Sequence, residues 1–214
     1  MKIRNLDNVY DQPVKGHYET EDYVFFWSGP FSNWHPSKFS MENSKLQVIK
    51  FNRAEQAMMY FKAELFGDED SMGKIMRTND PSLQKKIGRA VANYDEEVWK
   101  EKRYNIVFQL LVEKFKQNSD LKSILLNTGD KCIVECSPYD KIWGIGMGVD
   151  QYPEILDKSN WKGENLLGEI LMNVRSWLRD GYANLPVERN IGEILKLKMI
   201  DGYENICDKL YSMD

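Results

Sequence analysis

The chain has 214 residues, enough for one well-packed domain, and its 42% hydrophobic and 29% charged residues are typical of a globular protein. A formal net charge of −4 argues against strong general affinity for nucleic acid, although a few local cations could still hold a small phosphorylated ligand. No apolar run is long enough to span a membrane, and the N-terminus lacks the apolar segment of a secretory signal, so we expect a cytoplasmic protein.

Residues that commonly bind metals are sparse. Cys132, Cys136 and Cys207 form no C-x-x-C pair, and this odd, scattered set predicts buried, reduced thiols. The two histidines, His17 and His35, lie in different segments. We therefore expect no metal site and no cofactor.

The first part of the chain predicts short strands around an aromatic loop. A strand is expected near residues 9–10, and the β-prone residues 23–27 predict another. The following loop, 28–36, is rich in Gly, Ser, Pro and aromatic residues that either roof the core or line a binding cleft. Alternation over 46–51 predicts a half-buried strand that leads into a helix.

That helix is predicted over residues 51–66, where Ala, Met, Leu, Gln and Glu dominate and Gly67 follows. One broad arc should face the core, and Arg53, Gln56 and Glu64 should face water. The residues of the predicted core arc are Ala54, Ala57, Met58, Phe61 and Leu65.

Glu55 and Lys62 lie two turns apart at the margin of this arc, nearly superposed along the helix. A carboxylate and an ammonium beside apolar residues are costly to desolvate, so they need a partner or a function. The structural alternative makes Asn52 the N-cap of a capping box with Glu55, with Lys62 snorkelling from the rim. Both interpretations remain open at this point.

The rest of the chain predicts mainly helices. Asp80 with Pro81, and then Asp95, carry the signals of helix N-termini. The expected elements are helices near 72–76, over 81–92, from 95 to about 115, over 119–126, and from 161–168 to about 178; a strand over 131–136; and small helices over 191–200 and 203–211. We predict an α+β, predominantly α-helical single domain with a few short strands over residues 1–180, and a short helical C-terminal extension over 181–214.

Several stretches between residues 23 and 179, in the same order, resemble the YbiA-like, or NADAR, family. The matching residues are Phe31, Ser32 and Asn33; Glu55, Gln56, Ala57 and Lys62; Trp99; Leu125 to Thr128; Glu135, Ser137 and Pro138; Asp140, Trp143, Gly144, Ile145 and Gly146; and Trp161, Gly163, Asn165, Leu166, Gly168, Leu171, Met172, Val174 and Arg175.

The resemblance implies a compact, mainly helical domain that hydrolyses the N-glycosidic bond between ribose and an amine. Because we expect no metal site, this hydrolysis should be metal-independent. The implied substrates are ribosylamino-pyrimidine phosphates of the riboflavin pathway or ADP-ribose attached to guanine. A non-catalytic sensor of NAD or ADP-ribose is the alternative function, because it would use the same pocket without the acid chemistry.

Glu55, Lys62 and Asp140 are the catalytic candidates. A carboxylic acid can protonate the departing amine, and a carboxylate can stabilise the cationic sugar or activate water. Lys62 allows a second route, because a lysine can replace the amine as a Schiff base at C1 of the opened sugar. The residues alone do not choose between these routes.

Seven further residues are candidates for binding substrate. Trp99 and Trp143 would stack on the base or close the pocket, although core packing explains Trp99 nearly as well. Asn33 and Asn165 could bond ribose or phosphate oxygens, although Asn165 could also cap a helix. Gly144 and Gly146, with Gly148, would let backbone N–H groups reach a phosphate, and Arg175 would pin that phosphate or form a structural ion pair.

Overall fold

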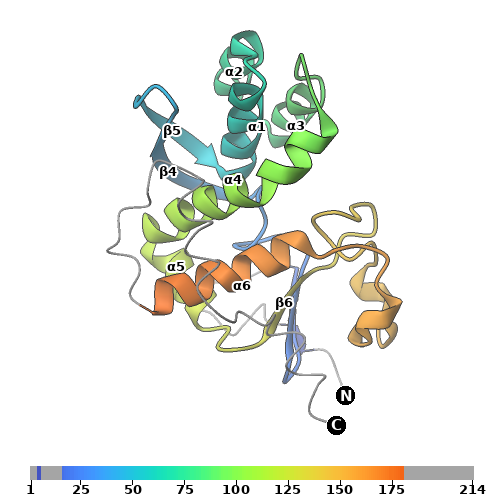
Figure 1. Ribbon diagram of the computed structural model, residues 1–214. Helices are drawn as coiled ribbons and strands as arrows, with labels where there is room; N and C mark the ends of the chain where they lie inside the picture. Colours follow the sequence, from blue (N-terminus) through green and yellow to red (C-terminus); the bar gives the residue numbers. More distant parts are fainter. Residues whose placement is uncertain (1–3, 6–15, 181–214) are drawn as a thin grey trace. The chain divides into compact units, whose positions relative to one another are not determined.

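The computed structural model describes residues 4–5 and 16–180 (Figure 1). The strand expected near residues 9–10 and the extension over 181–214 lie outside these ranges. Within them no helix is long and apolar enough to cross a membrane. The described chain divides into a sheet unit, residues 4–5, 16–32 and 123–179, and a helical unit, residues 33–122 with residue 180. The boundary predicted at residue 180 stays a prediction.

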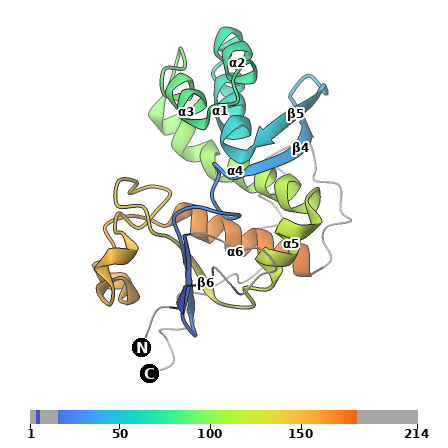
Figure 2. The same ribbon diagram turned by 180° about the vertical axis from the view of Figure 1, so that it is seen from behind.

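The sheet unit is built on four short strands in the order β1-β2-β3-β6. These are β1 (Arg4–Asn5), β2 (His17–Glu19), β3 (Tyr23–Phe26) and β6 (Cys132–Glu135). The first three pair antiparallel, whereas β3 and β6 run parallel with Phe26 opposite Glu135. Helix α6 (Leu166–Arg179) packs across β6, as Figure 2 shows. The strands expected over 23–27 and 131–136 are therefore confirmed.

Three 3₁₀ turns occupy the segment between β6 and α6: η1 (Val149–Gln151), η2 (Glu154–Leu156) and η3 (Lys158–Asn160). Side chains tie this segment down. The Tyr23 hydroxyl donates to the Leu156 carbonyl at 3.3 Å, and the Trp161 indole N–H donates to the Ile155 carbonyl at 2.9 Å. The chain from β6 to α6 is thus anchored to the sheet unit.

The cysteines of the sheet unit are buried, as expected: Cys132 lies in β6 and Cys136 directly follows that strand. Cys136 is free and buried, and burial, with the nearby Glu135 charge, raises the pKa of its thiol. Its low thiolate population makes Cys136 an inert core residue.

The helical unit packs a two-stranded hairpin against a group of helices. The hairpin joins β4 (Pro36–Glu42) to β5 (Val48–Arg53), and α1 (Ala54–Leu65) packs against α2 (Glu69–Met76), α3 (Pro81–Arg89) and α4 (Glu96–Lys116). The Asp80 carboxylate accepts the Ser82 N–H at 2.9 Å, and the Asp95 carboxylate accepts the Glu97 N–H at 2.9 Å, so both predicted caps are confirmed. Helix α5 (Ser119–Leu126), whose residues from Ser123 onward belong to the sheet unit, has its predicted bounds.

The predicted start of α1 is wrong by three residues. Residues 51–53 belong to β5, because β4 offers them ladder partners: Phe39 lies opposite Phe51, and Pro36 opposite Arg53. The predicted core arc is confirmed at its start, where Ala54, Ala57 and Met58 are buried, but Leu65 is 36% exposed. Even so, about 49% of the described residues are helical and 15% are in strands, which confirms the predicted α+β, mainly helical class.

Gln56 was expected to face water but is buried. Its side-chain oxygen accepts the Asn52 N–H at 2.9 Å, and its amide nitrogen donates to the carbonyls of Ile75 at 3.1 Å and Thr78 at 3.3 Å. Gln56 therefore fastens the start of α1 to the end of α2.

Replacing Gln56 with Leu should lower the free energy of unfolding by about 2–4 kcal/mol, because buried backbone groups lose their partners. Urea unfolding measures this change. Gln117→Leu is the matched control: Gln117 also makes two bonds to the Ser40 backbone, at 2.9 and 2.8 Å, but at an exposed site where water can replace them. Equal losses in the two variants would contradict the role assigned to Gln56.

Candidate functional site

The first turn of α1 positions Glu55. The N-cap residue is Arg53, which is extended and makes no side-chain capping bond, and the Glu55 N–H instead donates to the Asn33 carbonyl at 2.8 Å. Asn52 lies in β5, and its amide donates to the Asn79 side chain at 2.7 Å. The capping-box interpretation of Glu55 is therefore wrong. Glu55 is nevertheless buried, with only 2% of its surface exposed.

Lys62 lies two turns further along the same helix and is 8% exposed. Its Nζ lies 4.0 Å from the centroid of the Tyr94 ring and 5.3 Å from that of the Trp99 ring. Burial lowers the pKa of Lys62, while the charge of Glu96 opposes that change. The amine lies against aromatic rings rather than reaching into solvent, so snorkelling does not describe it.

Helix geometry sets the spacing of Glu55 and Lys62. Seven residues advance an α-helix by about 10 Å and bring the second Cα back to nearly the same side. Both side chains are buried. A carboxyl group and an amine with a lowered pKa on one helix face can flank a single substrate of nucleoside size.

Two other predicted residues lie in the same unit. Asn33 is 6% exposed, and among the described residues its side-chain oxygen has no hydrogen-bond partner. A buried amide oxygen left without a partner costs about 1–3 kcal/mol, so a ligand hydroxyl there would be stabilising. Trp99, from the first turns of α4, is 7% exposed and faces Lys62. In the helical unit, the backbone of Asn33 is therefore hydrogen-bonded to that of Glu55, and the Trp99 ring lies beside the Lys62 amine.

Tyr94 was not predicted, although its ring lies closer to the Lys62 amine than the ring of Trp99 does. It lies in the connection between α3 and α4, immediately before the Asp95 cap, and its hydroxyl donates to the Glu96 carboxylate. Burial and Glu96 raise the pKa of Tyr94 to about 12, so the phenol stays protonated at neutral pH. In the sequence, the position of Tyr94 directly before the helix-start signal at Asp95 was the only clue to its role.

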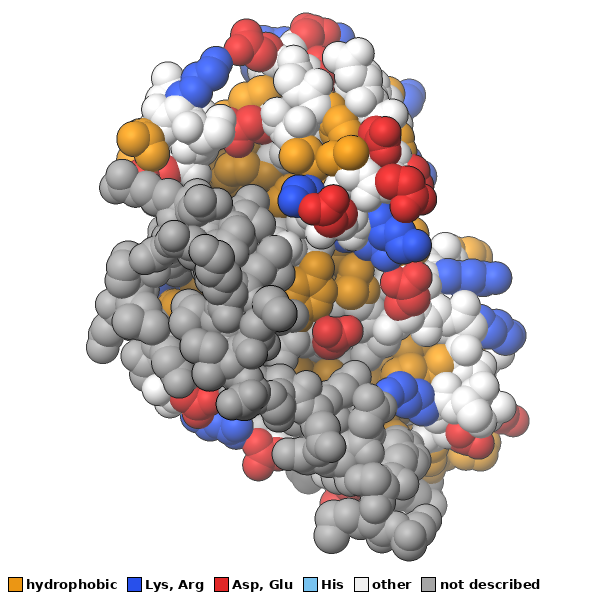
Figure 3. Space-filling model, viewed as in Figure 1, with side chains coloured by type: hydrophobic (Ala, Val, Ile, Leu, Met, Phe, Trp, Pro, Cys, Tyr) orange, Lys and Arg blue, Asp and Glu red, His pale blue; other side chains and the backbone are white. Residues whose placement is uncertain are grey.

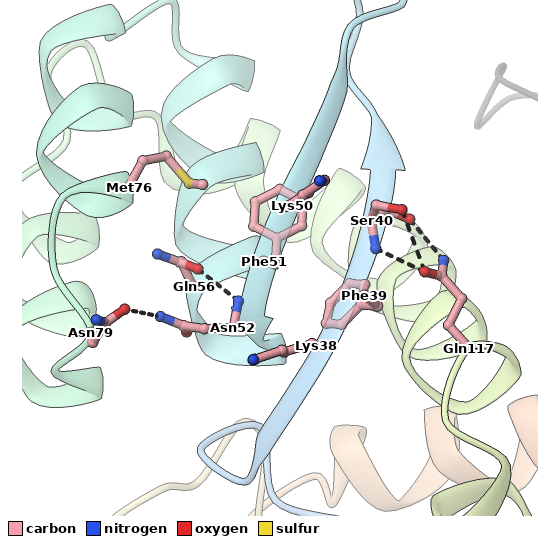
Figure 4. Close-up of a pocket in the computed structure, with 10 residues that line it drawn as sticks. All are labelled: Lys38, Phe39, Ser40, Lys50, Phe51, Asn52, Gln56, Met76, Asn79 and Gln117. Carbon is pink, nitrogen blue, oxygen red and sulfur yellow. Dashed lines mark hydrogen bonds between the residues drawn. The ribbon is translucent and has the colours of Figure 1, made fainter.

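A pocket of about 430 Å³ also lies in the helical unit, between the β4–β5 hairpin and the ends of α2 and α4 (Figure 4). Its polar side chains bond mainly to one another and to nearby backbone: Asn52 to Asn79, and Gln117 to Ser40. None of the predicted catalytic or substrate-binding residues lines it. We therefore assign the candidate site to the Glu55 and Lys62 face of α1.

Asp140 belongs to the sheet unit, in the loop that follows β6. Its carboxylate accepts the backbone N–H groups of Ile142 at 3.1 Å and Trp143 at 2.9 Å, and its own N–H donates to Ser137 Oγ at 3.2 Å. These bonds shape the turn that carries Trp143, which is half-buried. The position of Asp140 opposite Glu55 and Lys62 stays a prediction.

The loop glycines allow close packing of the chain on itself. A Cβ added at Gly144 would lie 2.8 Å from the Glu135 carbonyl oxygen. Gly146 has a φ of +66° and donates to the Asp140 carbonyl at 3.2 Å, and Gly148 donates to the Gln151 side chain at 3.2 Å. Because two of the three N–H groups already have partners, the geometry favours a structural role over a phosphate cradle.

Asn165 ties α6 to the sheet. Its side-chain oxygen accepts the Glu135 N–H and its amide nitrogen donates to the Ile133 carbonyl, both at 3.0 Å. Both polar groups are therefore engaged with the β6 backbone. A bond from Asn165 to substrate would have to replace one of them.

Replacing Asn165 with Ala should lower the free energy of unfolding by about 2–4 kcal/mol, because two buried backbone groups of β6 lose their partners. The turnover rate per folded molecule should stay unchanged. Thermal unfolding and steady-state kinetics on the same preparation separate the two effects. A large loss of turnover with normal stability would instead support substrate binding by Asn165.

Arg175 is fully buried in α6. Its Nη1 donates to Thr128 Oγ1 at 2.7 Å and to the Lys131 carbonyl at 2.8 Å, and burial lowers the pKa of Arg175 to about 10. The guanidinium thus fastens the turn between α5 and β6. Asp130 forms its ion pair with Arg179 instead. Binding of phosphate by Arg175 stays a prediction.

Comparisons with known proteins agree with this architecture. The family model of the NADAR domain matches residues 25–179. The chain is 41% identical over 165 residues to N-glycosidase R617 of Acanthamoeba polyphaga mimivirus, covering 73% of this chain and 96% of that protein. It is 38% identical over 181 residues to Protein irg-1 of Caenorhabditis elegans, covering 77% and 84%.

A solved structure shows the same fold. The NMR structure of Escherichia coli YbiA superposes with a TM-score of 0.60 at 23% identity, covering 82% of this chain and 96% of YbiA. The family match spans both described units and contains every candidate residue from Asn33 to Arg175. The chain therefore belongs to the NADAR family.

Proposed function

We propose that the protein is a metal-independent N-glycosidase that hydrolyses the ribosyl–amine bond of a ribosylated, nucleobase-like substrate. The observation that carries this proposal is the Lys62 amine, buried against Tyr94 and Trp99 on the same helix as the buried Glu55. The mimivirus relative and YbiA are both named N-glycosidases, which supports this proposal.

Such a reaction has two difficulties: the amine leaves poorly unless it is protonated, and C1 of the ribose becomes cationic. In the first route Glu55 donates a proton to the departing nitrogen as the C1–N bond breaks, and water adds to C1. Asp140 stabilises the cation or removes a proton from that water. The burial of Glu55 supports this role, because it keeps bulk water away from the proton that is transferred.

In the second route the sugar opens to an imine at C1, and the neutral Lys62 amine adds to that carbon. The original amine leaves with a proton from Glu55, which produces a Schiff base on Lys62. Water then adds to C1 and releases the lysine. The lowered pKa of Lys62 supports this route, because only the unprotonated amine has a lone pair to donate.

The binding residues have different support. Asn33 and Trp99 belong to the same unit as Glu55 and Lys62. The side-chain oxygen of Asn33, which has no hydrogen-bond partner among the described residues, would bind a ribose hydroxyl, and the ring of Trp99 would stack on the base. Trp143 would stack on the base from the loop of Asp140. Phosphate binding by Gly146 and Asn165 is a weaker proposal, because their N–H groups already bond to the chain itself. Gly144 bonds through its carbonyl and Arg175 through Nη1, and among the described residues the Nε and Nη2 atoms of Arg175 have no hydrogen-bond partner, so these two residues remain better candidates.

Two substrate classes follow from this chemistry. A Vibrio vulnificus relative is named a riboflavin biosynthesis protein, which supports ribosylamino-pyrimidine phosphates. ADP-ribose attached to guanine contains the same kind of bond. Both classes should be incubated with the protein, with and without EDTA, while released ribose phosphate or ADP-ribose is measured.

Turnover of either substrate that is unchanged by EDTA is the expected result. Binding of both substrates without turnover by the folded protein would overturn the enzyme assignment. Calorimetry with NAD and ADP-ribose then tests the alternative, since a sensor binds an intact ligand and returns it unchanged.

A further inference from the structure

The pocket on the β4–β5 hairpin has a chemistry of its own. It lies in the helical unit, has a volume of about 430 Å³, and is lined by no residue with a part in the proposed reaction (Figure 4). Sites for small ligands commonly have volumes of about 300–1,000 Å³. The pocket therefore has room for more than a single ion.

The solvent face of the hairpin supplies two lysines to this pocket. Phe39 lies opposite Phe51 in the strand register, and both rings are buried. Successive residues of a strand point to opposite faces, so the exposed Lys38 and Lys50 lie on the other face. Ser40, two residues after Lys38, is directly opposite Lys50. Both flexible amines can thus reach one ligand.

These two lysines are the charged side chains of the pocket, and no carboxylate lines it. Neither the Lys38 nor the Lys50 ammonium has an ion pair or hydrogen bond with another described residue. In contrast, Lys45 in the turn of the same hairpin pairs with Glu69 at 2.9 Å. On the face shown in Figure 3, Lys and Arg side chains are likewise interspersed with Asp and Glu. Two unpaired cations side by side therefore favour an anionic ligand.

The amide oxygens that line the pocket already accept hydrogen bonds from the chain. The Asn79 oxygen accepts the Asn52 amide at 2.7 Å, and the Asn52 oxygen accepts the Arg53 Nε–H at 3.1 Å. The side-chain oxygens of Gln56 and Gln117 accept backbone N–H groups, each at 2.9 Å. The pocket therefore offers few acceptors to a ligand.

The groups that stay open are hydrogen-bond donors. The side-chain nitrogen of Asn79 donates to no other described group, and the ammonium groups of Lys38 and Lys50 are open in the same way. An ammonium only donates, whereas an ionised acid only accepts. A pocket with open donors and engaged acceptors selects an anion over an amine or a neutral amide.

We propose that this pocket binds a sugar phosphate, whose phosphate contacts Lys38 and Lys50 and whose hydroxyls accept from Asn79. A phosphate ester carries a charge of about −1.5 to −2 at pH 7, which two lysines balance better than they do the single charge of a carboxylate. The body of the ligand is polar, because the Phe39 and Phe51 rings are only 4% and 3% exposed and offer no face for stacking. This site is separate from the proposed function and does not rest on it.

NMR shifts of the full chain should be followed while glucose 6-phosphate, glucose, gluconate or inorganic phosphate is added. These probes separate the phosphate ester from its sugar, from a carboxylate of similar size and from the free ion. We expect glucose 6-phosphate to bind most tightly, with a dissociation constant of about 1 mM, because exposed ion contacts contribute modestly. It should shift the Asn79 side-chain amide and the backbone amides of Lys38 and Lys50.

Three substitutions test the assigned contacts. Lys38→Gln and Lys50→Gln should each weaken the binding of glucose 6-phosphate by about 3- to 30-fold, because one charged contact is lost. Asn79→Asp should abolish binding. The aspartate keeps an oxygen that accepts the Asn52 amide, but it removes the open donor and repels the phosphate.

Lys45→Gln is the matched control, because this lysine belongs to the same hairpin but does not line the pocket, and the variant should bind normally. Unshifted pocket resonances at about 10 mM glucose 6-phosphate would overturn the proposal. Equally tight binding of glucose, gluconate or inorganic phosphate would also overturn it, as would normal binding by a protein carrying both Lys38→Gln and Lys50→Gln. Glucose 6-phosphate has no ribosyl–amine bond, so these outcomes are independent of the proposed N-glycosidase activity.

Discussion

Replacing Lys62 with Met should lower the turnover rate by at least about 10³-fold, because the variant has no amine to form the Schiff base. Met keeps the apolar bulk against the rings of Tyr94 and Trp99. The lost cation–π contact, worth about 0.5–2 kcal/mol, is offset by relief of the cost of burying the ammonium, so the melting temperature should change little. Steady-state kinetics and thermal unfolding measure both effects.

Lys62→Arg and Lys86→Met are the controls for this prediction. Arg keeps a cation near the rings but cannot form an imine, so that variant should also be inactive. Lys86 is exposed on α3, and its replacement should leave turnover unchanged. Substantial activity in Lys62→Arg would show that the positive charge, not the amine nucleophile, is what the reaction requires.

The rate should also depend on pH in a defined direction. Burial lowers the pKa of Lys62 below its usual 10.5, so the neutral amine becomes abundant at a lower pH than for an exposed lysine. If the Schiff-base route operates, the rate of the lysine step rises with pH and levels off above that lowered pKa. Borohydride added during turnover should then leave a mass adduct on Lys62, and repeated absence of the adduct favours the carboxylate route.

Replacing Glu55 with Gln should lower the turnover rate by about 10²- to 10⁴-fold, the usual range for loss of a general acid or base. The amide has the same shape, and Glu55 is not part of a capping box, so the helix should keep its start. Loss of a negative charge in the first turn costs at most about 1 kcal/mol through the helix dipole. Kinetics and urea unfolding should be measured together.

Glu64→Gln supplies the comparison on the same helix. Glu64 accepts a bond from the Ser44 hydroxyl at 2.9 Å, which an amide oxygen can also accept, and it has no proposed part in the reaction. This variant should keep normal turnover. Full activity in Glu55→Gln, combined with a large loss of stability, would mean that Glu55 serves the fold rather than the chemistry.

Local signals in the sequence predicted several elements well. Asp80 and Asp95 each start a helix, because a side chain that accepts backbone N–H groups two or three residues later needs no distant partner. The strand over 23–27 was predicted because its run of aromatic and β-branched residues favours extended backbone. The same kind of reasoning placed Glu55 and Lys62 on one side of a helix.

Long-range contacts explain the errors. Strand β4 was not predicted, because its residues form a strand only when β5 pairs with them, and that pairing also takes residues 51–53 out of the helix. Gln56 looked solvent-exposed because its partners, Ile75 and Thr78, come from the end of another helix. Tyr94 was missed for the same reason: only the packing of α1 on α4 and its preceding turn brings its ring to Lys62.

The sequence by itself determined the fold class, the helix starts at Asp80 and Asp95, and the family, because these depend on composition, local hydrogen-bonding capacity and the order of motifs. Only the tertiary structure decided that Lys62 is buried against Tyr94 and Trp99, and that the polar groups of Asn165 bond to β6. The physical reason is that desolvation and the pairing of a polar group depend on which distant side chains and backbone groups surround it. A linear pattern specifies which face of an element a residue occupies, but not what lies opposite.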